Sequence, residues 1–549
     1  MDTRTLELLR ATSQYFSERQ REAYLVGGSV RDILLGEACI DWDIVTDGDA
    51  SRLARGLADR LGGHYAHLHD KASRVVVKGE EQEIVFDVAP FKGSSLEEDL
   101  RLRDFTLNAM AAPLDETARY FEMRNDGRSL PGLPHTGRGH SGRGQASPVH
   151  LIDPLHGAAD VKARCLRAVD DGVFRDDPLR LLRAVRLRMR YGLHVDGWTE
   201  GLMRRDAALL ARAAAQRVHD ELYAILKPDG AGERLRYMDE LGLLTVLMPE
   251  FAAARGMRQP GPHFWDVLEH SMESVGALER LARMLQEGRD DAGDYEVEGH
   301  EGESVPKAGD HKGPLPTPHH PRPSGDEAWS GLAEIHTLLR EAREQGVFRF
   351  ADLTAPRMKL AALLHDVGKP VTYKVDKDGS VHFYHHQQAG VPLAQQVMKR
   401  LGASTQDRRL VELVTAHHMR PGQLAQSGVV TPRAIRRFFV DLGPTGIAVA
   451  LFSLADHLAT LGPQPLTESW EQHVDVVRLL LVRYIRERES ILPPRLVSAE
   501  ELMRRLKLGR GPQVGQLLDQ IAEAQAEGMV RSKEEALWWA EEWLREWTP

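Results

Sequence analysis

Residues 25–46 read LVGGSVRDILLGEACIDWDIVT, and this stretch decides the fold of the region around it. A short apolar run ends in two glycines, a helical pattern begins at once, and a second apolar run opens with two aspartates. Glycines let backbone N–H groups close on a polyphosphate at the start of a helix, where the helix dipole favours an anion. The residues that we expect to hold a nucleotide here are Gly27, Gly28, Ser29 and Arg31.

The two aspartates, Asp41 and Asp43, lie at the start of the second predicted strand. Because side chains alternate across a strand, both point to one face and Trp42 points to the other. Carboxylate oxygens are the hard ligands that Mg²⁺ prefers, so the sequence predicts a magnesium site beside the phosphate turn. A Gly-Gly turn or an Asp-x-Asp alone occurs by chance, but the order strand, turn, helix, strand supports a functional interpretation.

The composition is that of a large globular protein. Its 549 residues, 42% of them hydrophobic, leave room for about three to five domains. The net charge of −10 and the pI of about 6.2 give no support to a nucleic-acid partner, which would need a local basic surface. Two cysteines without paired spacing, no signal-like apolar segment and no apolar run of ~20 residues indicate a cytoplasmic protein without a membrane partner. Oligomeric state is not predicted.

The pattern Gly-Gly-x-Val-Arg-Asp-x-x-Leu-Gly followed by Asp-x-Asp resembles the signature of the nucleotidyltransferases of the DNA polymerase β superfamily. It is most similar to the bacterial-type (class II) branch that holds tRNA CCA-adding enzymes and poly(A) polymerases. This resemblance implies an α/β nucleotidyltransferase head followed by an all-α neck, an HD domain and a helical tail. It also implies Mg²⁺ as cofactor and, as partners, the tRNA acceptor end with CTP or ATP.

Three short strands are predicted at 64–70, 73–78 and 84–89, after a helix over 51–61. The last of these strands contains Asp87. A third carboxylate on a neighbouring strand would complete a two-metal site and help to deprotonate or orient an attacking hydroxyl. The alternative is an ordinary outward-facing aspartate of a half-exposed strand.

The segment 95–109 reads SLEEDLRLRDFTLNA and carries two further candidate residues. Arg103 offers a guanidinium to a phosphate, and Asn108 offers an amide to a ribose hydroxyl. The segment resembles the family motif Arg-Arg-Asp-Phe-Thr-x-Asn-Ala, with Leu102 where the first arginine usually stands. The nucleotide-contacting role therefore carries over to Arg103, the second arginine of the motif.

The connection after Asp87 is short, because VAPFKGS leads directly to a helix whose start is predicted by Ser95 and Glu98. Full CCA-adding members of the family carry a flexible segment here that helps to remodel the pocket for the final A. Relatives that lack this segment add only the two C residues. The resemblance therefore points to an enzyme that adds CMP from CTP to the tRNA 3′ end and releases pyrophosphate, with full CCA addition or poly(A) synthesis as alternatives.

A helix with a basic face is predicted after Asp176, where an Asp-Pro pair gives a start signal. A carboxylate that accepts from an exocyclic amine, beside a guanidinium that donates to a ring nitrogen, admits C and A and rejects U and G. The arrangement matches the family's Glu-Asp-x-x-Arg base-reading motif, with Asp176 in place of Glu. The residues expected to read the base and reach the triphosphate are Asp177, Arg180, Arg183 and Arg186. An ordinary solvated basic face is the alternative. Residues 161–190 hold nine Arg or Lys against four Asp, which gives the local basic surface that a nucleic-acid partner needs.

Histidine and aspartate recur in a particular order in the second half of the chain, as Glu-His, then Leu-His-Asp, then Ala-Asp-His. This order resembles that of the HD-domain metal-dependent phosphohydrolases. The expected metal ligands are His270, His365, Asp366 and Asp456, with His385, His386 and His417 lining the same cleft. Mixed nitrogen and oxygen ligation suits Mn²⁺, Ni²⁺ or Mg²⁺, and the resemblance implies activity on 2′-phosphates or 2′,3′-cyclic phosphates. The alternative is that the HD fold serves only as an RNA-binding body.

The predicted organisation has four parts. They are the head (1–160), the neck (161–255), the HD domain (256–465) and the tail (466–549), with insertions at about 124–148 and 287–328. Both insertions are rich in Gly, Pro, His and charged residues without apolar periodicity, so we expect them to be disordered. A scaffold with an inactive head is a further alternative, against which the complete head motifs argue.

Overall fold

The computed structural model describes residues 2–37, 39, 41–69, 72–79, 82–125, 149–287, 326–464 and 466–547. The predicted insertions at 124–148 and 287–328 lie outside these residues, apart from a few at their edges. The chain forms two compact units, Met1–Glu221 with Leu241–Val246, and Leu222–Glu240 with Leu247–Pro549. The domain boundaries expected from the sequence, which divide the chain more finely, stay a prediction.

The first unit contains a six-stranded sheet in the order β3-β4-β5-β2-β1-β6. Its strands are β1 (Ala23–Val26), β2 (Asp41–Thr46), β3 (His64–His69), β4 (Ala72–Lys78), β5 (Glu83–Pro90) and β6 (Ala111–Pro113). Only the central pair β2–β5 is parallel, whereas the other neighbouring strands run antiparallel. The predicted strands are confirmed to within one residue at each end, and buried positions alternate with more exposed ones along β4 and β5, as in a pleated strand.

Helices surround this sheet and pack on it or on one another through apolar faces. They are α1 (Thr3–Glu18), α2 (Gly28–Leu35), α3 (Ala50–Leu61), α4 (Leu96–Arg101) and α5 (Leu114–Asn125). In α3 the buried residues recur at Leu53, Leu57 and Leu61, the spacing of one helix face. Trp42 is fully buried and meets Phe121 edge to face with ring centroids 6.3 Å apart. The predicted separation of Trp42 from the aspartates on either side of it is therefore confirmed.

The remainder of the first unit is mostly helical. It comprises α6 (Gly157–Lys162), α7 (Val173–Asp176), α8 (Arg180–Tyr191), α9 (Gly197–Asp206) and most of α10 (Ala215–Leu226), with a short parallel pair of β7 (Cys165–Leu166) and β8 (His194–Val195). Helix α8 begins at Arg180, three residues after Asp177, which is in an extended conformation. The sequence predicted the helix but placed its start too early, because Pro178 and Leu179 form a turn before it.

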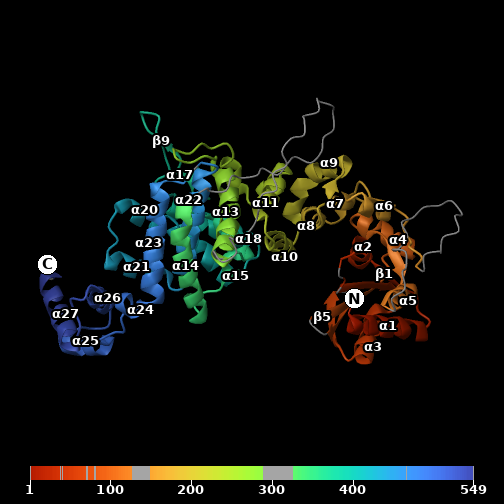
Figure 1. Ribbon diagram of the computed structural model, residues 1–549, viewed down its shortest axis with the longest axis horizontal. Helices are drawn as coiled ribbons and strands as arrows, with labels where there is room; N and C mark the ends of the chain where they lie inside the picture. The colour runs from red at the N-terminus through yellow and green to blue at the C-terminus, as the bar shows by residue number, and fades with distance from the viewer. Residues whose placement is uncertain are drawn as a thin grey trace. The chain divides into compact units, whose positions relative to one another are not determined.

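The second unit is almost entirely helical (Figure 1). Its larger helices are α11 (Ala231–Glu240), α13 (Val267–Glu287), α14 (Asp326–Glu344), α16 (Pro356–Leu364), α18 (His386–Arg400), α19 (Thr405–His417), α20 (Met419–Ser427), α21 (Pro432–Leu442), α22 (Thr445–Leu461) and α23 (Glu468–Ile485). The last helices are α24 (Arg488–Ile491), α25 (Ala499–Leu506), α26 (Pro512–Ala526) and α27 (Lys533–Trp547). The tail has its own apolar core around Leu502, Leu517 and Ile521.

Among the described residues, no single helix has both the length and the apolar composition needed to cross a membrane. Helices α21 and α22 reach the required length and apolar composition only when taken together, and they meet at a bend of 108°.

Candidate functional site

Ser29 connects the start of helix α2 to the start of strand β2 through hydrogen bonds. The backbone N–H of Asp43 donates to Ser29 Oγ at 2.7 Å, and Ser29 Oγ donates to the carbonyl of Asp41 at 3.0 Å. Gly27 has a φ of 64°, and a Cβ atom on it would lie 3.3 Å from Asp43 Oδ2. A side chain there would be strained and would crowd the carboxylate. The structure thus brings the predicted phosphate turn and the predicted metal site together.

Three carboxylates converge on the two central strands. Asp43 of β2 and Asp87 of β5 are Cα partners in register, and Asp41 lies exposed at the beginning of β2. Burial raises the pKa of Asp43 to about 6, against the opposing effect of Arg103 and with a further increase from Asp87. Arg74 of β4 holds both oxygens of Asp87 at 2.8 Å. The donor chemistry and the glycine cradle behind Asp43 fit a divalent cation held by Asp41 and Asp43.

Arg103 lies beside the Gly27 turn. Its Nε and Nη2 donate to Asp99 Oδ2 at 3.0 and 2.7 Å, and buried Asp99 also accepts from the N–H of Lys92. This support directs Nη1 toward the glycines, so that a Cβ on Gly27 would lie only 2.9 Å from it. A fixed guanidinium at the start of a helix suits a triphosphate, which is consistent with the predicted role of Arg103.

Arg31 and Asn108 are buried in the structure and bond to other protein groups. Arg31 Nη1 donates to Asn108 Oδ1 at 2.7 Å, and Arg31 Nη2 donates to the Tyr191 hydroxyl at 2.7 Å. Tyr191 in turn donates to Asp32 Oδ1 at 2.9 Å. Their contact with a nucleotide stays a prediction. The geometry gives Arg31 the role of joining α2 to the end of α8, and Asn108 supports its guanidinium while donating to Asp104. Sequence reasoning missed Tyr191, since nothing marks a tyrosine at a helix end as special.

The predicted base-reading residues lie at the start of α8 and along it, each held by a neighbour. Asp177 Oδ2 pairs with Arg217 at 2.7 Å, and Arg180 donates to the carbonyls of Leu102 and Val173 at 2.9 and 3.2 Å. Further along, Arg183 pairs with Asp104 at 2.9 Å and Arg186 pairs with Glu221 at 2.7 Å. Burial alone would raise the pKa of Asp104, but Arg183 and the hydrogen bond from Asn108 bring it below its usual value. The side chains of α8 are therefore positioned before any nucleotide binds.

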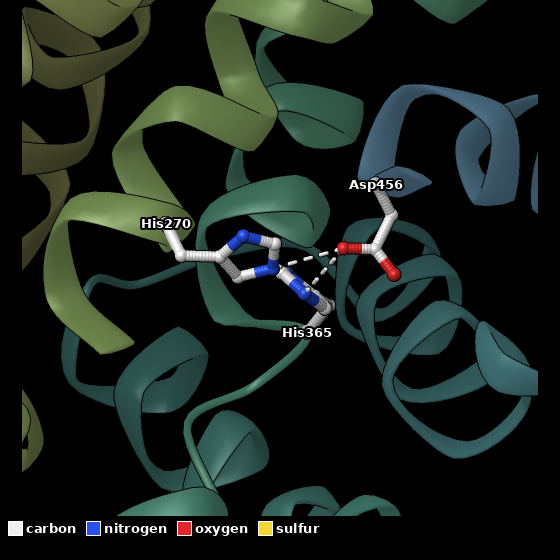
Figure 2. A group of neighbouring side chains, drawn as sticks. All are labelled: His270, His365 and Asp456. Carbon is white, nitrogen blue, oxygen red and sulfur yellow. Dashed lines mark ion pairs between the residues drawn. The ribbon is translucent and has the colours of Figure 1, made fainter. Parts of the chain in front are cut away.

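A second site lies in the helical unit. His270 of α13, His365 at the end of α16 and Asp456 of α22 point toward one another from three helices (Figure 2). His270 Nε2 lies 2.9 Å and His365 Nε2 lies 3.3 Å from Asp456 Oδ1. Asp366 completes the predicted set, with Oδ2 at 3.0 Å from His365 Nε2. The structure brings together all four residues predicted as ligands.

Backbone carbonyls fix the orientation of three imidazole rings in this cluster. His365, His386 and His418 each direct Nδ1 to the carbonyl of the residue three positions earlier, at 2.7, 2.9 and 3.1 Å. With the proton on Nδ1, each ring presents the lone pair of Nε2 to the cluster. The part of the cluster that the structure describes holds four buried polar atoms without a hydrogen bond, which lie at ion-pair distances from one another. They are His365 Nε2, His386 Nε2, Asp366 Oδ1 and Asp456 Oδ1. This donor set fits a divalent metal.

The charges of the cluster also fit a bound cation. Burial alone would lower the pKa of His365, but Asp366 and Asp456 raise it to about 10. Lys369 Nζ pairs with Asp366 Oδ2 at 2.6 Å. Both buried carboxylates therefore draw positive charge to the cluster, and a divalent ion would supply it in place of the proton on His365.

The structure shows which of the histidines predicted to line this cleft face the cluster. His386 Nε2 lies 3.1 Å from Asp366 Oδ1, whereas its neighbour His385 is exposed. Sequence reasoning chose His417, but His418 is the residue that turns inward, 3.6 Å from the same oxygen. The signal that identifies His418 is helical spacing, because it continues the buried series of Val411, Val414 and Thr415.

Three family models match the chain. The Poly A polymerase head domain matches residues 23–122, the probable RNA and SrmB-binding site of polymerase A matches 192–255, and the HD domain matches 337–461. The A-adding tRNA nucleotidyltransferase of Deinococcus radiodurans is 30% identical over 95% of this chain and 96% of its own. The CC-adding tRNA nucleotidyltransferase of Thermus thermophilus is 30% identical over 94% of this chain and 92% of its own.

Solved structures with the same fold include a CCA-adding enzyme in complex with ATP. It has a TM-score of 0.57 at 19% identity and covers 99% of this chain and 95% of its own. The Thermotoga maritima CCA-adding enzyme complexed with tRNA has a TM-score of 0.52 at 19% identity, over 99% and 96% of the two chains. The fold expected from the sequence, a nucleotidyltransferase head followed by helical parts and an HD domain, is confirmed. The chain belongs to the tRNA nucleotidyltransferases, enzymes that add nucleotides to RNA 3′ ends.

Proposed function

We propose that the head adds CMP residues from CTP to the tRNA 3′ end until the CC of the terminal CCA is complete, with release of pyrophosphate. The observation that carries this proposal is the connection between β5 and α4. It spans only residues 91–95, and its backbone is tied to α4 by bonds from Lys92 N to Asp99 and from Ser94 N to Glu98, at 2.9 and 2.8 Å. A connection this short and anchored leaves no mobile segment to remodel the pocket for a final A.

Catalysis by this head is mostly positioning and charge stabilisation. Mg²⁺ held by Asp41 and Asp43 would neutralise the triphosphate and lower the pKa of the tRNA 3′-hydroxyl. The Gly27–Gly28 backbone and Arg103 hold the triphosphate with the α-phosphorus open to in-line attack. Asp87, kept in place by Arg74, accepts a hydrogen bond from the attacking hydroxyl and orients it. The hydroxyl oxygen loses its proton to solvent as it bonds to the α-phosphorus, the bond from the α-phosphorus to the bridging oxygen breaks, and pyrophosphate leaves.

Base choice rests on Asp177 and Arg180. The carboxylate accepts from the exocyclic amine of cytosine, while the guanidinium donates to the neighbouring ring nitrogen. Adenine offers the same donor and acceptor, so this pair excludes U and G but does not separate C from A. The size of the pocket therefore determines the choice of C over A. The short connection after β5, which is tied to α4, sets that size.

Single-nucleotide extension tests this proposal. Transcripts of one tRNA that end before the first C, after the first C and after the second C are each incubated with Mg²⁺ and either CTP or ATP. We expect CTP to extend the first two transcripts and neither nucleotide to extend the third. The relative named A-adding is as similar as the one named CC-adding, so extension of the third transcript by ATP would assign A addition instead. The His365→Ala variant, altered in the other unit, is the active control and Asp43→Ala the inactive one.

A second function is supported by the cluster of His270, His365, Asp366 and Asp456. Its buried donors and oriented imidazoles favour a metal-dependent phosphohydrolase that acts on 2′-phosphates or 2′,3′-cyclic phosphates. Its test is hydrolysis of 2′,3′-cyclic CMP with Ni²⁺, Mn²⁺ or Mg²⁺, beside calorimetric titration of each ion. Binding and hydrolysis that are both lost in His365→Ala support the function. Absence of hydrolysis with every ion leaves the HD domain as an RNA-binding body.

A further inference from the structure

A small hairpin projects from the second unit beside α17 (Lys369–Thr372), as Figure 1 shows. Strands β9 (Lys374–Val375) and β10 (Val381–His382) pair antiparallel, and the N–H of Asp376 closes the turn by donating to the carbonyl of Ser380 at 2.9 Å. The hairpin lies in the chain between Asp366 and His386, two residues of the metal cluster. The chain therefore runs from one residue of that cluster through the hairpin to another.

The hairpin carries aromatic rings that are largely exposed. Tyr384 is 57% and Tyr373 46% exposed, and the neighbouring Val371 and Val375 are at least half exposed. The imidazole of His382 stacks on the Tyr384 ring with centroids 4.9 Å apart and planes 13° from parallel. So small a hairpin buries little of its own apolar surface, and a group of exposed aromatic and apolar residues marks an interaction surface.

Direct contacts connect these rings to the metal cluster. The ring of Phe383 lies 5.9 Å from that of Tyr373, and Lys369 Nζ lies 5.7 Å from the centroid of Phe383. Lys369 is also the partner of Asp366 at 2.6 Å. In addition, the carbonyl of Phe383 accepts the hydrogen bond that orients His386. The aromatic surface and the cluster are therefore continuous through Lys369 and Phe383.

The charges of the hairpin indicate which ligand it suits. Lys374 and Lys377 are exposed, but Asp376 and Asp378 balance them, and Asp376 pairs with His382 at 3.1 Å. A groove that follows an RNA backbone needs an excess of positive charge, which this surface lacks. Flat exposed rings bind nucleobases by stacking, which tolerates any base because every base has a flat face. The surface suits the last bases of an RNA end rather than a long stretch of RNA.

We propose that His382, Tyr384 and Tyr373 form a stacking platform for the terminal bases of a single-stranded RNA 3′ end whose phosphate lies at the HD cluster. This inference rests on the proposed phosphohydrolase function and names its substrate class. The platform positions the phosphate ester by holding the base beside it, and Lys369 lies between base and phosphate. It gives the HD site a preference for RNA ends over phosphate esters that carry no base.

Base stacking is tested directly by fluorescence, without turnover. A short RNA that ends in 2-aminopurine with a 3′-phosphate is added to the full chain, and quenching of the terminal base is followed for wild type, Tyr384→Ala and Tyr384→Phe. We expect Tyr384→Ala to weaken the affinity about 5- to 100-fold and Tyr384→Phe to keep it, since stacking needs the ring and not the hydroxyl. Equal quenching in wild type and Tyr384→Ala, or no quenching in wild type, would overturn the platform.

Hydrolysis separates failure of the platform from failure of the enzyme function. With an RNA that ends in a 2′,3′-cyclic phosphate, we expect Tyr384→Ala to raise KM by a similar factor and to leave kcat unchanged. With the same RNA carrying an abasic terminal ribose, we expect the two proteins to have equal KM. Quenching without hydrolysis would retain the platform and reject the phosphohydrolase. Hydrolysis with the same KM in wild type and Tyr384→Ala would retain the enzyme and reject the platform.

Discussion

Asp43 and Asp87 face each other in register on the parallel strands β2 and β5. The two aspartates differ in their surroundings. Asp87 is neutralised by both nitrogens of the Arg74 fork, whereas Asp43 is backed by the Gly27–Gly28 turn and has a pKa raised by burial to about 6. Asp43 is therefore the carboxylate of this pair that gains most from a cation, and Asp87 is the one already held in place.

Replacing Asp43 tests its role in catalysis. We expect Asp43→Ala to lower the rate of CMP addition by on the order of a thousandfold or more, because charge stabilisation at the triphosphate is lost. Binding of tRNA, measured by filter retention, should be unchanged, because Asp43 lies at the nucleotide side of the site. Asp59→Ala, on the exposed face of α3, is the matched control and should keep full activity. A rate for Asp43→Ala close to that of the control would remove the metal role.

The raised pKa of Asp43 predicts a pH-dependent requirement for Mg²⁺. Above a pKa of about 6 the carboxylate is ionised and the metal binds without competition, whereas below it a proton must first leave. The Mg²⁺ concentration for half-maximal CMP addition should therefore rise about tenfold for each pH unit below that value and stay constant above it. A half-maximal Mg²⁺ concentration that does not change on either side would contradict this assignment.

Base selection can be altered at Asp177. An amide at this position presents a donor as well as an acceptor, so Asp177→Asn should lower the preference for CTP over UTP by about 10- to 100-fold in kcat/KM. Asp59→Asn is the control, since Asp59 is exposed on α3, outside the base-reading motif, and its change should leave the preference intact. Competition between labelled CTP and UTP on one tRNA measures the ratio. An unchanged ratio in Asp177→Asn would show that other groups read the base.

Buried Lys359 predicts a strong effect on stability. It is fully buried, its Nζ lies 2.6 Å from Glu279 Oε1, and it donates to the carbonyls of Leu226 and Pro228 at 2.8 and 3.0 Å. Lys359→Ala removes the counter-charge of buried Glu279, which keeps only bonds from two backbone N–H groups, so we expect a loss of about 3–5 kcal/mol in the free energy of unfolding of this unit. Exposed Lys399→Ala should change it by less than about 0.5 kcal/mol. Equal urea midpoints for the two variants would refute the buried pair.

Much of the head was predictable because its signals are local. Short runs rich in β-branched residues located β4 and β5, and the Gly-Gly turn followed by Asp-x-Asp located the carboxylates and the helix beside them. The start of α8 was misplaced since an Asp-Pro pair is a start signal wherever it occurs, and only the structure shows Asp177 extended before the turn. The sequence does not reveal that Arg31 bonds to Tyr191, because the two residues lie far apart along the chain.

In the histidine–aspartate cluster, too, the sequence predicted some of the residues but not all of them. Residue type and order identified His270, His365, Asp366 and Asp456, since few other arrangements of histidine and aspartate suit a divalent ion. The choice between His417 and His418 depends on the phase of α19, which residue type does not reveal. The sequence did not indicate Lys369, because lysine is not a usual metal ligand. Its place in the cluster depends on its ion pair with Asp366, three residues earlier in the chain.

The central claim is that addition stops after the second C. Its most direct measurement is extension of a tRNA transcript that ends before the first C, with CTP, ATP and Mg²⁺ all present and the products resolved at single nucleotides. We expect product to accumulate with two residues added, both of them C. Accumulation of a product with a third residue, A, would contradict it and would show that the anchored connection between β5 and α4 does not limit addition.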